Sequence, residues 1–144
     1  IFHRIIEDFM NQGGDIDNQN GAGGYAAKWF GYCNGESRSS SSACEQSQWT
    51  IPDEADNGLK HGPGKIAMAK TQAENTGGSQ FYIVPTGSTP SHLDGVHTVF
   101  GEVTSGMPHV DAINKVETGN NDNDSSTSGD KPIDDVVLMS VSVN

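Results

Sequence analysis

Residues 2–15 read FHRIIEDFMNQGGD, and this stretch says more about the fold than any other. Over residues 1–12, β-branched and aromatic residues are mixed with polar ones, which predicts a strand. Phe9 and Met10 interrupt the alternation within it. The Gly-Gly-Asp at 13–15 then ends the segment, because adjacent glycines are typical of turns.

Short segments with the composition of strands recur further along the chain. They are KIAMA at 65–69, QFYIV at 80–84, VFGEV at 99–103 and a last segment at 136–143. Segment 80–84 is the clearest, and Pro85 ends it. By contrast, residues 25–50 contain isolated aromatic side chains but no regular pattern, and the serine-rich stretch within them predicts no secondary structure.

One segment has the spacing of a helix. Apolar residues stand at 107, 110, 113 and 116, and Pro108 suits the first helical turn. Residues 118–131 are small and polar, which predicts a solvated loop. Asp122-Asn123-Asp124 resembles a calcium-binding loop but lacks the glycine and closing glutamate of that motif, so the solvated loop is favoured. Many short strands and one helix predict a mostly antiparallel barrel or sandwich.

Length and charge narrow the function classes. The chain has 144 residues, enough for one domain, and 18 of them are glycine. The formal net charge is −11, which disfavours nucleic acid and anionic membrane surfaces as partners. No apolar run approaches the ~20 residues of a membrane-spanning helix.

Three segments carry a resemblance to a known family. They are the opening FHRIIEDFMNQGGD, then IAMA at 66–69 with GSQFYI at 78–83, and finally HLDGVHTVFG at 92–101. In content, order and spacing they resemble the signatures of cyclophilin-type peptidyl-prolyl cis/trans isomerases. The resemblance covers residues 1–24 and about 51–143, so residues 25–50 are interpreted as an insertion.

The resemblance implies a fold. Family members form a closed, antiparallel eight-stranded barrel capped by two helices. This sequence begins inside the segment that resembles the third strand, so the family's first hairpin and first helix are expected to be missing here. The prediction is a single, partial cyclophilin-like domain over 1–144, with an insertion loop at 25–50.

The resemblance also implies an activity, which is acceleration of rotation about X–Pro bonds during protein folding. Arg4 matches the family's catalytic arginine, and no metal or cofactor is implied. Proline-containing peptides and unfolded proteins are the expected partners of a chain that would be a monomer when complete. The alternative is a proline-peptide-binding scaffold or chaperone module with little turnover. The presence of Arg4 favours the enzyme.

The family's substrate pocket maps onto residues from all three signatures. Gln12 matches the residue that bonds the substrate backbone, and the main chain at 69–70 is expected to pair with an extended peptide. Gln80 is included among the substrate-binding positions, although a structural role is favoured for it. The complete set of expected substrate-binding residues is Phe9, Met10, Gln12, Ala69, Lys70, Gln80, Tyr82, Leu93, His97 and His92.

Three positions depart from the common family pattern. Tyr82 stands where Phe is usual, which adds a hydroxyl near the base of the pocket. His92 stands where many members have Trp, so cyclosporin-type macrocycles are expected to bind weakly. Lys70 replaces a common Asn at a position where the family contact is largely main chain.

Cys33 and Cys44 are the two cysteines of the chain, and their spacing does not fit a CxxC redox or zinc motif. Two free thiols are one possibility. A disulfide is favoured, because the segment between them is short, polar and flanked by aromatic residues. A disulfide would indicate an extracytoplasmic location, and free thiols a cytoplasmic one.

Overall fold

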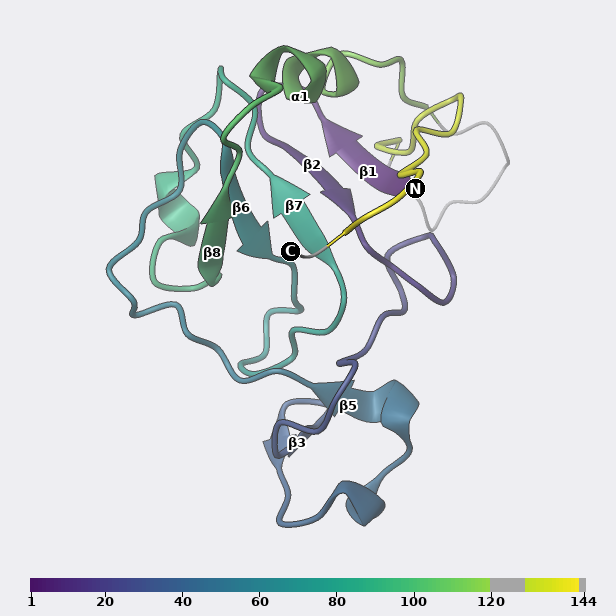
Figure 1. Ribbon diagram of the computed structural model, residues 1–144, viewed down its shortest axis with the longest axis vertical. Coiled ribbons are helices and arrows are strands. Elements are labelled where there is room, and N and C mark those ends of the chain that lie inside the picture. The colour runs from purple at the N-terminus through teal and green to yellow at the C-terminus, as the bar shows by residue number, and fades with distance from the viewer. Residues whose placement is uncertain (120–128, 143–144) are drawn as a thin grey trace.

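A computed structural model describes residues 1–119 and 129–142, and its main element is an antiparallel five-stranded sheet with strand order β1-β2-β7-β6-β8 (Figure 1). The strands are β1 (Phe2–Ile6), β2 (Met10–Gly13), β6 (Lys65–Met68), β7 (Phe81–Ile83) and β8 (Val99–Glu102). The prediction of a mostly β, antiparallel fold is confirmed. The described residues form an open sheet, and no pairing between β1 and β8 closes it into a barrel.

The opening segment is a hairpin, so the prediction of one strand over 1–12 was wrong. Asp8 adopts a positive φ of 55°, and the Phe9 N–H donates to the Ile6 carbonyl at 3.1 Å. The chain therefore reverses at 7–9, and β2 returns along β1 with Arg4 opposite Gln12. The break in alternation at Phe9 and Met10 coincides with this turn, because Phe9 is the last residue of the turn and Met10 is the first residue of β2.

Besides separate buried side chains such as Ile5 and Val110, the core contains a cluster of buried apolar residues. Its buried members are Met10, Ala67, Ala69, Tyr82, Val84 and Val99, and Ile6, Phe9 and Leu93 pack against them. Helix α1 (Met107–Ile113) lies across one end, near the β1–β2 turn (Figure 1). Asn114 follows the helix and donates to the Ile6 carbonyl at 2.9 Å and to Asn11 Oδ1 at 2.7 Å. The helix is shorter than the predicted 107–116, because Asn114 ends it with these bonds to the hairpin.

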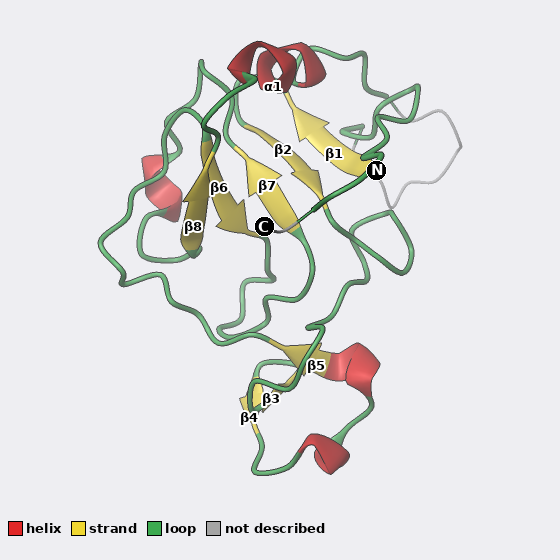
Figure 2. Ribbon diagram, viewed as in Figure 1, coloured by secondary structure: helices red, strands yellow, loops and turns green. Residues whose placement is uncertain are grey.

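Residues 25–50 form a lobe with a small sheet of their own, so the prediction of no regular structure was wrong. Its strand order is β4-β3-β5, with β3 at Tyr32–Cys33, β4 at Glu36–Ser37 and β5 at Trp49–Thr50. Two short 3₁₀ helices, Ser41–Ala43 and Gln46–Gln48, complete it. Figure 2 shows the lobe at the end of the molecule opposite α1.

Cys33 and Cys44 are joined by a disulfide within this lobe, with their Cα atoms 6.4 Å apart. The bond links β3 to the segment between the two 3₁₀ helices. It therefore closes a short loop that has few apolar contacts of its own. The Trp29 and Trp49 rings, 5.5 Å apart between centroids, are the main aromatic contact there.

Replacing both cysteines by serine should loosen the lobe and leave the main sheet almost unchanged. Closing so short a loop stabilises by about 2–3 kcal/mol in the chain-entropy model, and the closed loop lies entirely within the lobe. Limited proteolysis should cut the double variant between 25 and 50 while the remaining fragments stay associated. Intact-mass analysis after alkylation without reductant is the control. Two alkylated thiols in freshly isolated native protein would show that the bond does not form.

The expected strand at 136–143 is not formed over 136–142, the part of it that the structure describes. Phe2 N–H donates to the Val136 carbonyl at 2.9 Å, which makes one isolated bridge, and residues 137–142 have no regular structure. Met139 and Val141 are largely exposed. Strand composition alone does not make a strand, because the backbone groups also need a partner along their whole length. Asp122-Asn123-Asp124 lies outside the described residues.

Among residues 1–119 and 129–142 there is no helix of the length and apolar character that a membrane span requires.

Candidate active site

A cavity of about 240 Å³ brings the three signature segments together. Phe9, Met10, Tyr82 and Leu93 provide its apolar walls. Polar groups surround them at the rim. The full lining is Arg4, Phe9, Met10, Gln12, Ala69, Lys70, Tyr82, Leu93 and His97.

Strand register explains why residues far apart in sequence meet here. Arg4 pairs with Gln12 across β1 and β2, and Gln12 pairs with Tyr82 across β2 and β7. Side chains directly opposite each other in an antiparallel sheet share a face. The remaining wall comes from the 3₁₀ helix Ser91–Leu93 and the turn after it, which carries His97.

Arg4 lies at the rim of the cavity and is held there by an ion pair. Its Nε donates to Asp130 Oδ2 at 3.0 Å, and Nη1 lies 3.5 Å from Gln12 Oε1. The side chain is 42% exposed. The Asp130 carboxylate thus anchors the inner edge of the guanidinium and leaves the outer nitrogens beside the cavity.

The other cation in the lining, Lys70, is turned away from the cavity. Its side chain is only 3% exposed, and Nζ lies 3.1 Å from Asp53 Oδ2 and 3.1 Å from the Ala73 carbonyl. The Lys70 ammonium is therefore engaged by Asp53 and by the Ala73 carbonyl. Removing the ammonium would unpair Asp53 rather than a ligand.

Two rings complete the wall opposite Arg4. The Tyr82 and His97 rings meet edge to face, with centroids 5.9 Å apart. His97 Nδ1 lies 3.0 Å from the Met68 carbonyl, to which it donates. Burial lowers the pKa of His97, so its imidazole is neutral at pH 7. The pKa of the Tyr82 phenol is raised, first by burial and then by the Asp94 carboxylate, so it stays protonated.

Similarity to known proteins shows the family to which this chain belongs. A sequence model described as cyclophilin type peptidyl-prolyl cis-trans isomerase/CLD matches residues 1–143. The chain belongs to the cyclophilin family. Peptidyl-prolyl cis-trans isomerase cypE of Dictyostelium discoideum is 38% identical over all of this chain and 72% of its own length.

Two fungal peptidyl-prolyl cis-trans isomerases are also similar to this chain. Peptidyl-prolyl cis-trans isomerase-like 1 of Gibberella zeae is 38% identical over 99% of this chain and 70% of its own length. Peptidyl-prolyl cis-trans isomerase D of Saccharomyces cerevisiae is 36% identical over 96% of this chain and 48% of its own length. These matches therefore run from one end of the chain to the other.

Two of the residues predicted for the cyclophilin site lie outside the cavity. His92 stacks on Phe9 at the rim, with ring centroids 5.8 Å apart and planes 24° apart. Gln80 is 9% exposed, and its Nε2 donates to the Gly21 and Gly23 carbonyls at 2.9 and 2.6 Å. Gln80 Oε1 accepts from Gln12 Nε2 at 2.8 Å. Gln80 therefore fixes Gln12 in place.

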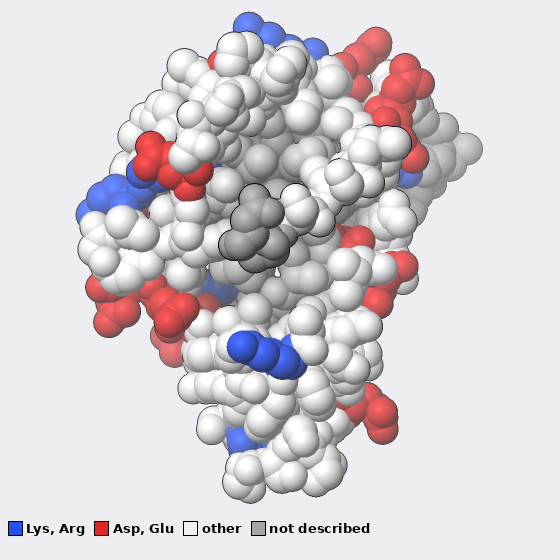
Figure 3. All heavy atoms as spheres, viewed as in Figure 1, with Lys and Arg blue, Asp and Glu red and all other residues white. Residues whose placement is uncertain are grey.

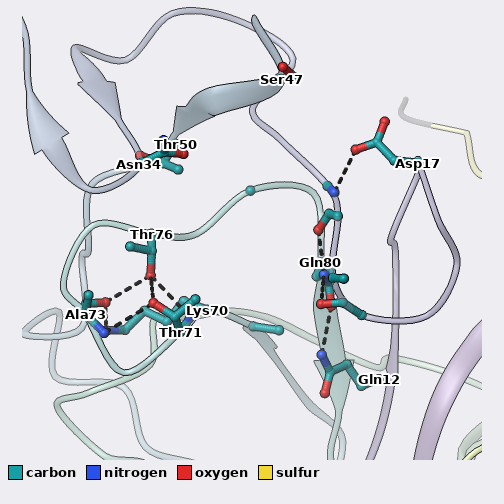
Figure 4. Close-up of a pocket in the computed structure, with 16 residues that line it drawn as sticks. Gln12, Asp17, Asn34, Ser47, Thr50, Lys70, Thr71, Ala73, Thr76 and Gln80 are labelled. Atoms are coloured by element: carbon teal, nitrogen blue, oxygen red, sulfur yellow. Dashed lines mark hydrogen bonds between the residues drawn. The ribbon is translucent and has the colours of Figure 1, made fainter. Parts of the chain in front are cut away.

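A second, larger cavity of about 500 Å³ adjoins the first and shares Gln12, Ala69 and Lys70 with it (Figure 4). Asn34, Ser47 and Thr50 of the insertion line its far side. Its lining is mostly hydroxyl, amide and glycine. The lobe at 25–50 is thus part of the surface beside the smaller cavity.

A single glycine allows the insertion to sit so close to the loop at 70–78. Gly35 has a φ of +84°, and a Cβ there would lie 2.7 Å from the Glu74 carbonyl oxygen and 2.8 Å from Thr76 Cγ2. Any other side chain would push the lobe away from the loop.

On the face shown in Figure 3, acidic side chains lie mainly along the margins.

Sequence reasoning missed three residues that support the site: Asp130, His61 and Asp94. Asp130 is 126 positions from Arg4, in a segment that resembles an ordinary solvated loop. His61 and Asp94 make their bonds beneath the pocket, to Tyr82 and to each other. In the sequence, the hydroxyl of Tyr82 was the feature that pointed to such partners, because a buried phenol needs a hydrogen-bond partner.

Among the described residues no group of three His, Cys, Asp or Glu side chains could hold a metal ion.

Proposed function

We propose that this chain accelerates cis/trans rotation about X–Pro peptide bonds, with Arg4 as the catalytic residue. The observation that carries the proposal is a guanidinium held by Asp130 at the rim of a cavity of about 240 Å³ with apolar walls. The family of the chain supports it. The substrates are prolyl peptides, and unfolded proteins are the source of such segments.

The chemistry is a rotation in which no bond is cleaved. Amide resonance sets a barrier of about 18–20 kcal/mol. As the bond twists, the prolyl nitrogen becomes pyramidal and gains a lone pair. A fixed donor aimed at that nitrogen binds the transition state more tightly than the ground state, which lowers the barrier. Arg4 is suited to this because its charge is permanent and its donors form a rigid fork.

The pocket holds the substrate in place. The proline ring occupies the slot formed by Phe9, Met10 and Leu93, with Tyr82 behind it. The Ala69 N–H already donates to the Gln80 carbonyl at 3.0 Å. Pairing with an extended peptide is therefore assigned to the Ala69 carbonyl and the main chain of Lys70.

A protease-coupled assay on a proline tetrapeptide, started from a cis-enriched solution, tests this function. The slow phase of this assay is isomerisation of the cis peptide. Catalysis should raise the rate constant of this phase in proportion to protein concentration. Calorimetric binding of the same peptide should be measured alongside. Binding without any change in the slow phase would instead indicate the scaffold function.

Cyclosporin-type macrocycles should bind weakly, and His92→Trp should tighten the binding. Indole offers a larger apolar face than imidazole and an N–H donor at the rim beside Phe9. The gain should be about three- to tenfold, the range of one such contact. Calorimetry on the parent and the variant makes the comparison. Equal or weaker affinity in the Trp variant would show that His92 does not limit the binding.

A further inference from the structure

A chain of hydrogen bonds runs beneath the proline pocket. The Tyr82 hydroxyl lies 2.7 Å from His61 Nε2, and His61 Nδ1 lies 2.9 Å from Asp94 Oδ1. The same Asp94 oxygen also accepts the His61 backbone N–H at 2.8 Å. The His61 side chain is fully buried, and Tyr82 is 4% exposed.

The proton positions follow from what each group can do. An ionised carboxylate only accepts, so His61 Nδ1 carries the proton that it donates to Asp94. In the neutral imidazole with its proton on Nδ1, Nε2 is an acceptor, and the Tyr82 hydroxyl donates to it. Every polar atom in the series is satisfied, which is required of a buried network. The phenol oxygen is consequently engaged below the pocket instead of adding a free hydroxyl to its base.

The network connects separate walls of the pocket. Tyr82 comes from β7, and Asp94 follows Leu93 at the end of the 3₁₀ helix. The Leu93 carbonyl accepts the N–H groups of Val96 and His97, at 3.0 and 3.1 Å. The bonds from Tyr82 through His61 to Asp94 thus fix the ring behind the proline relative to the turn that carries Leu93 and His97.

We propose that His61 and Asp94 are positioning residues for the proline pocket, acting through the hydroxyl of Tyr82. They hold the Tyr82 ring with its apolar surface against the slot and its polar atom away from the substrate. A Phe at this position would fill the slot without that tether. The proposal rests on the proposed function, since it names what shapes the substrate site.

Removing the tether should weaken ground-state and transition-state binding equally, because proline contacts the ring in both. That predicts a higher KM with little change in kcat. Loss of Arg4 should do the opposite, because its donor acts mainly in the transition state. The two roles therefore give different kinetic signatures.

The test is Tyr82→Phe, which deletes one oxygen, with Tyr32→Phe in β3 of the insertion as the matched control. In Tyr82→Phe, KM and the calorimetric Kd for a proline tetrapeptide should rise about three- to tenfold, with kcat within about twofold. Tyr32→Phe should change neither. Unchanged KM and Kd in a folded Tyr82→Phe variant would overturn the proposal.

A double-mutant cycle and a spectroscopic readout test the tether itself. Tyr82→Phe and His61→Phe should be strongly non-additive in Kd, because either one breaks the same connection. His109→Phe on α1 is the control for losing an imidazole. The ¹⁵N resonance of His61 Nε2 should move in Tyr82→Phe and stay in place in Tyr32→Phe. An unmoved resonance, or additive effects in the cycle, would show that the tether does not act.

The measurements separate failure of this proposal from failure of the proposed function. If the chain does not catalyse isomerisation, the parent shows no accelerated phase, and peptide Kd and the His61 resonance still report on the tether. If only the tether is wrong, Arg4→Ala still lowers kcat while Tyr82→Phe leaves Kd unchanged.

Discussion

Replacing Arg4 by alanine is expected to lower kcat by about 10²- to 10³-fold, the typical effect of deleting one donor to a transition state. Peptide affinity should fall only modestly, because the apolar walls of the pocket stay in place. Arg4 is the one cation of the lining directed to the rim, since Lys70 is held by Asp53. The measurement is the protease-coupled rate together with calorimetric Kd.

Two further variants sharpen the Arg4 test. Arg4→Lys keeps the charge, but one ammonium cannot both hold Asp130 and reproduce the outer nitrogens, so most of the loss should remain. Arg38→Ala removes a surface arginine that pairs with Glu36 in the insertion and should leave the rate unchanged. Near-parental activity in Arg4→Ala would falsify the mechanism.

Replacing Asp15 by alanine is expected to destabilise the protein by about 2–4 kcal/mol, because a buried carboxylate that satisfies several donors is lost. Its Oδ1 accepts the N–H groups of Asp17 and Asn18, each at 3.1 Å. Its Oδ2 accepts those of Asn20, Gly21 and Gly23, at 2.9–3.3 Å. This one side chain therefore organises the whole loop at 15–24.

The loop matters to the active site as well as to stability. The Gly21 and Gly23 carbonyls hold Gln80, and Gln80 holds Gln12 in the pocket. Asp15→Ala should therefore also raise KM. Asp17→Ala is the control, because Asp17 accepts one N–H, from Gly24, in an exposed position. Denaturant unfolding should show the large loss in stability only for Asp15.

The same carboxylate predicts a pH dependence of stability. Burial alone would raise the pKa of Asp15, but the backbone N–H groups around it outweigh burial and lower the pKa from 3.8 to about 2. A carboxyl with a lower pKa in the folded state stabilises above its unfolded pKa. That contribution, about 2 kcal/mol, should be lost as the pH falls from about 4 to 2. An equally steep loss in Asp15→Asn over that range would show that other groups cause it.

Local pattern predicted much of this protein correctly. Periodicity located β6, β7, β8 and the start of α1, because short apolar runs and helical spacing are properties of neighbouring residues. It failed at the β1–β2 turn, where the positive φ of Asp8 is not encoded by a glycine or proline. It also failed at the last predicted strand. Over its described residues, 136–142, the composition is that of a strand, but the pairing is limited to one bridge between Val136 and Phe2.

The family could be assigned from the sequence alone, and the signatures predicted every residue that lines the smaller cavity, but Gln80 and His92 of the predicted set lie outside it. The groups that hold those side chains in place became visible in the three-dimensional fold. The bond from Arg4 to Asp130 and the series from Tyr82 through His61 to Asp94 join residues 126, 21 and 33 positions apart. Such partners have no periodic relation along the chain. They are selected by burial, since each enclosed donor and acceptor must find whatever group the fold places within reach.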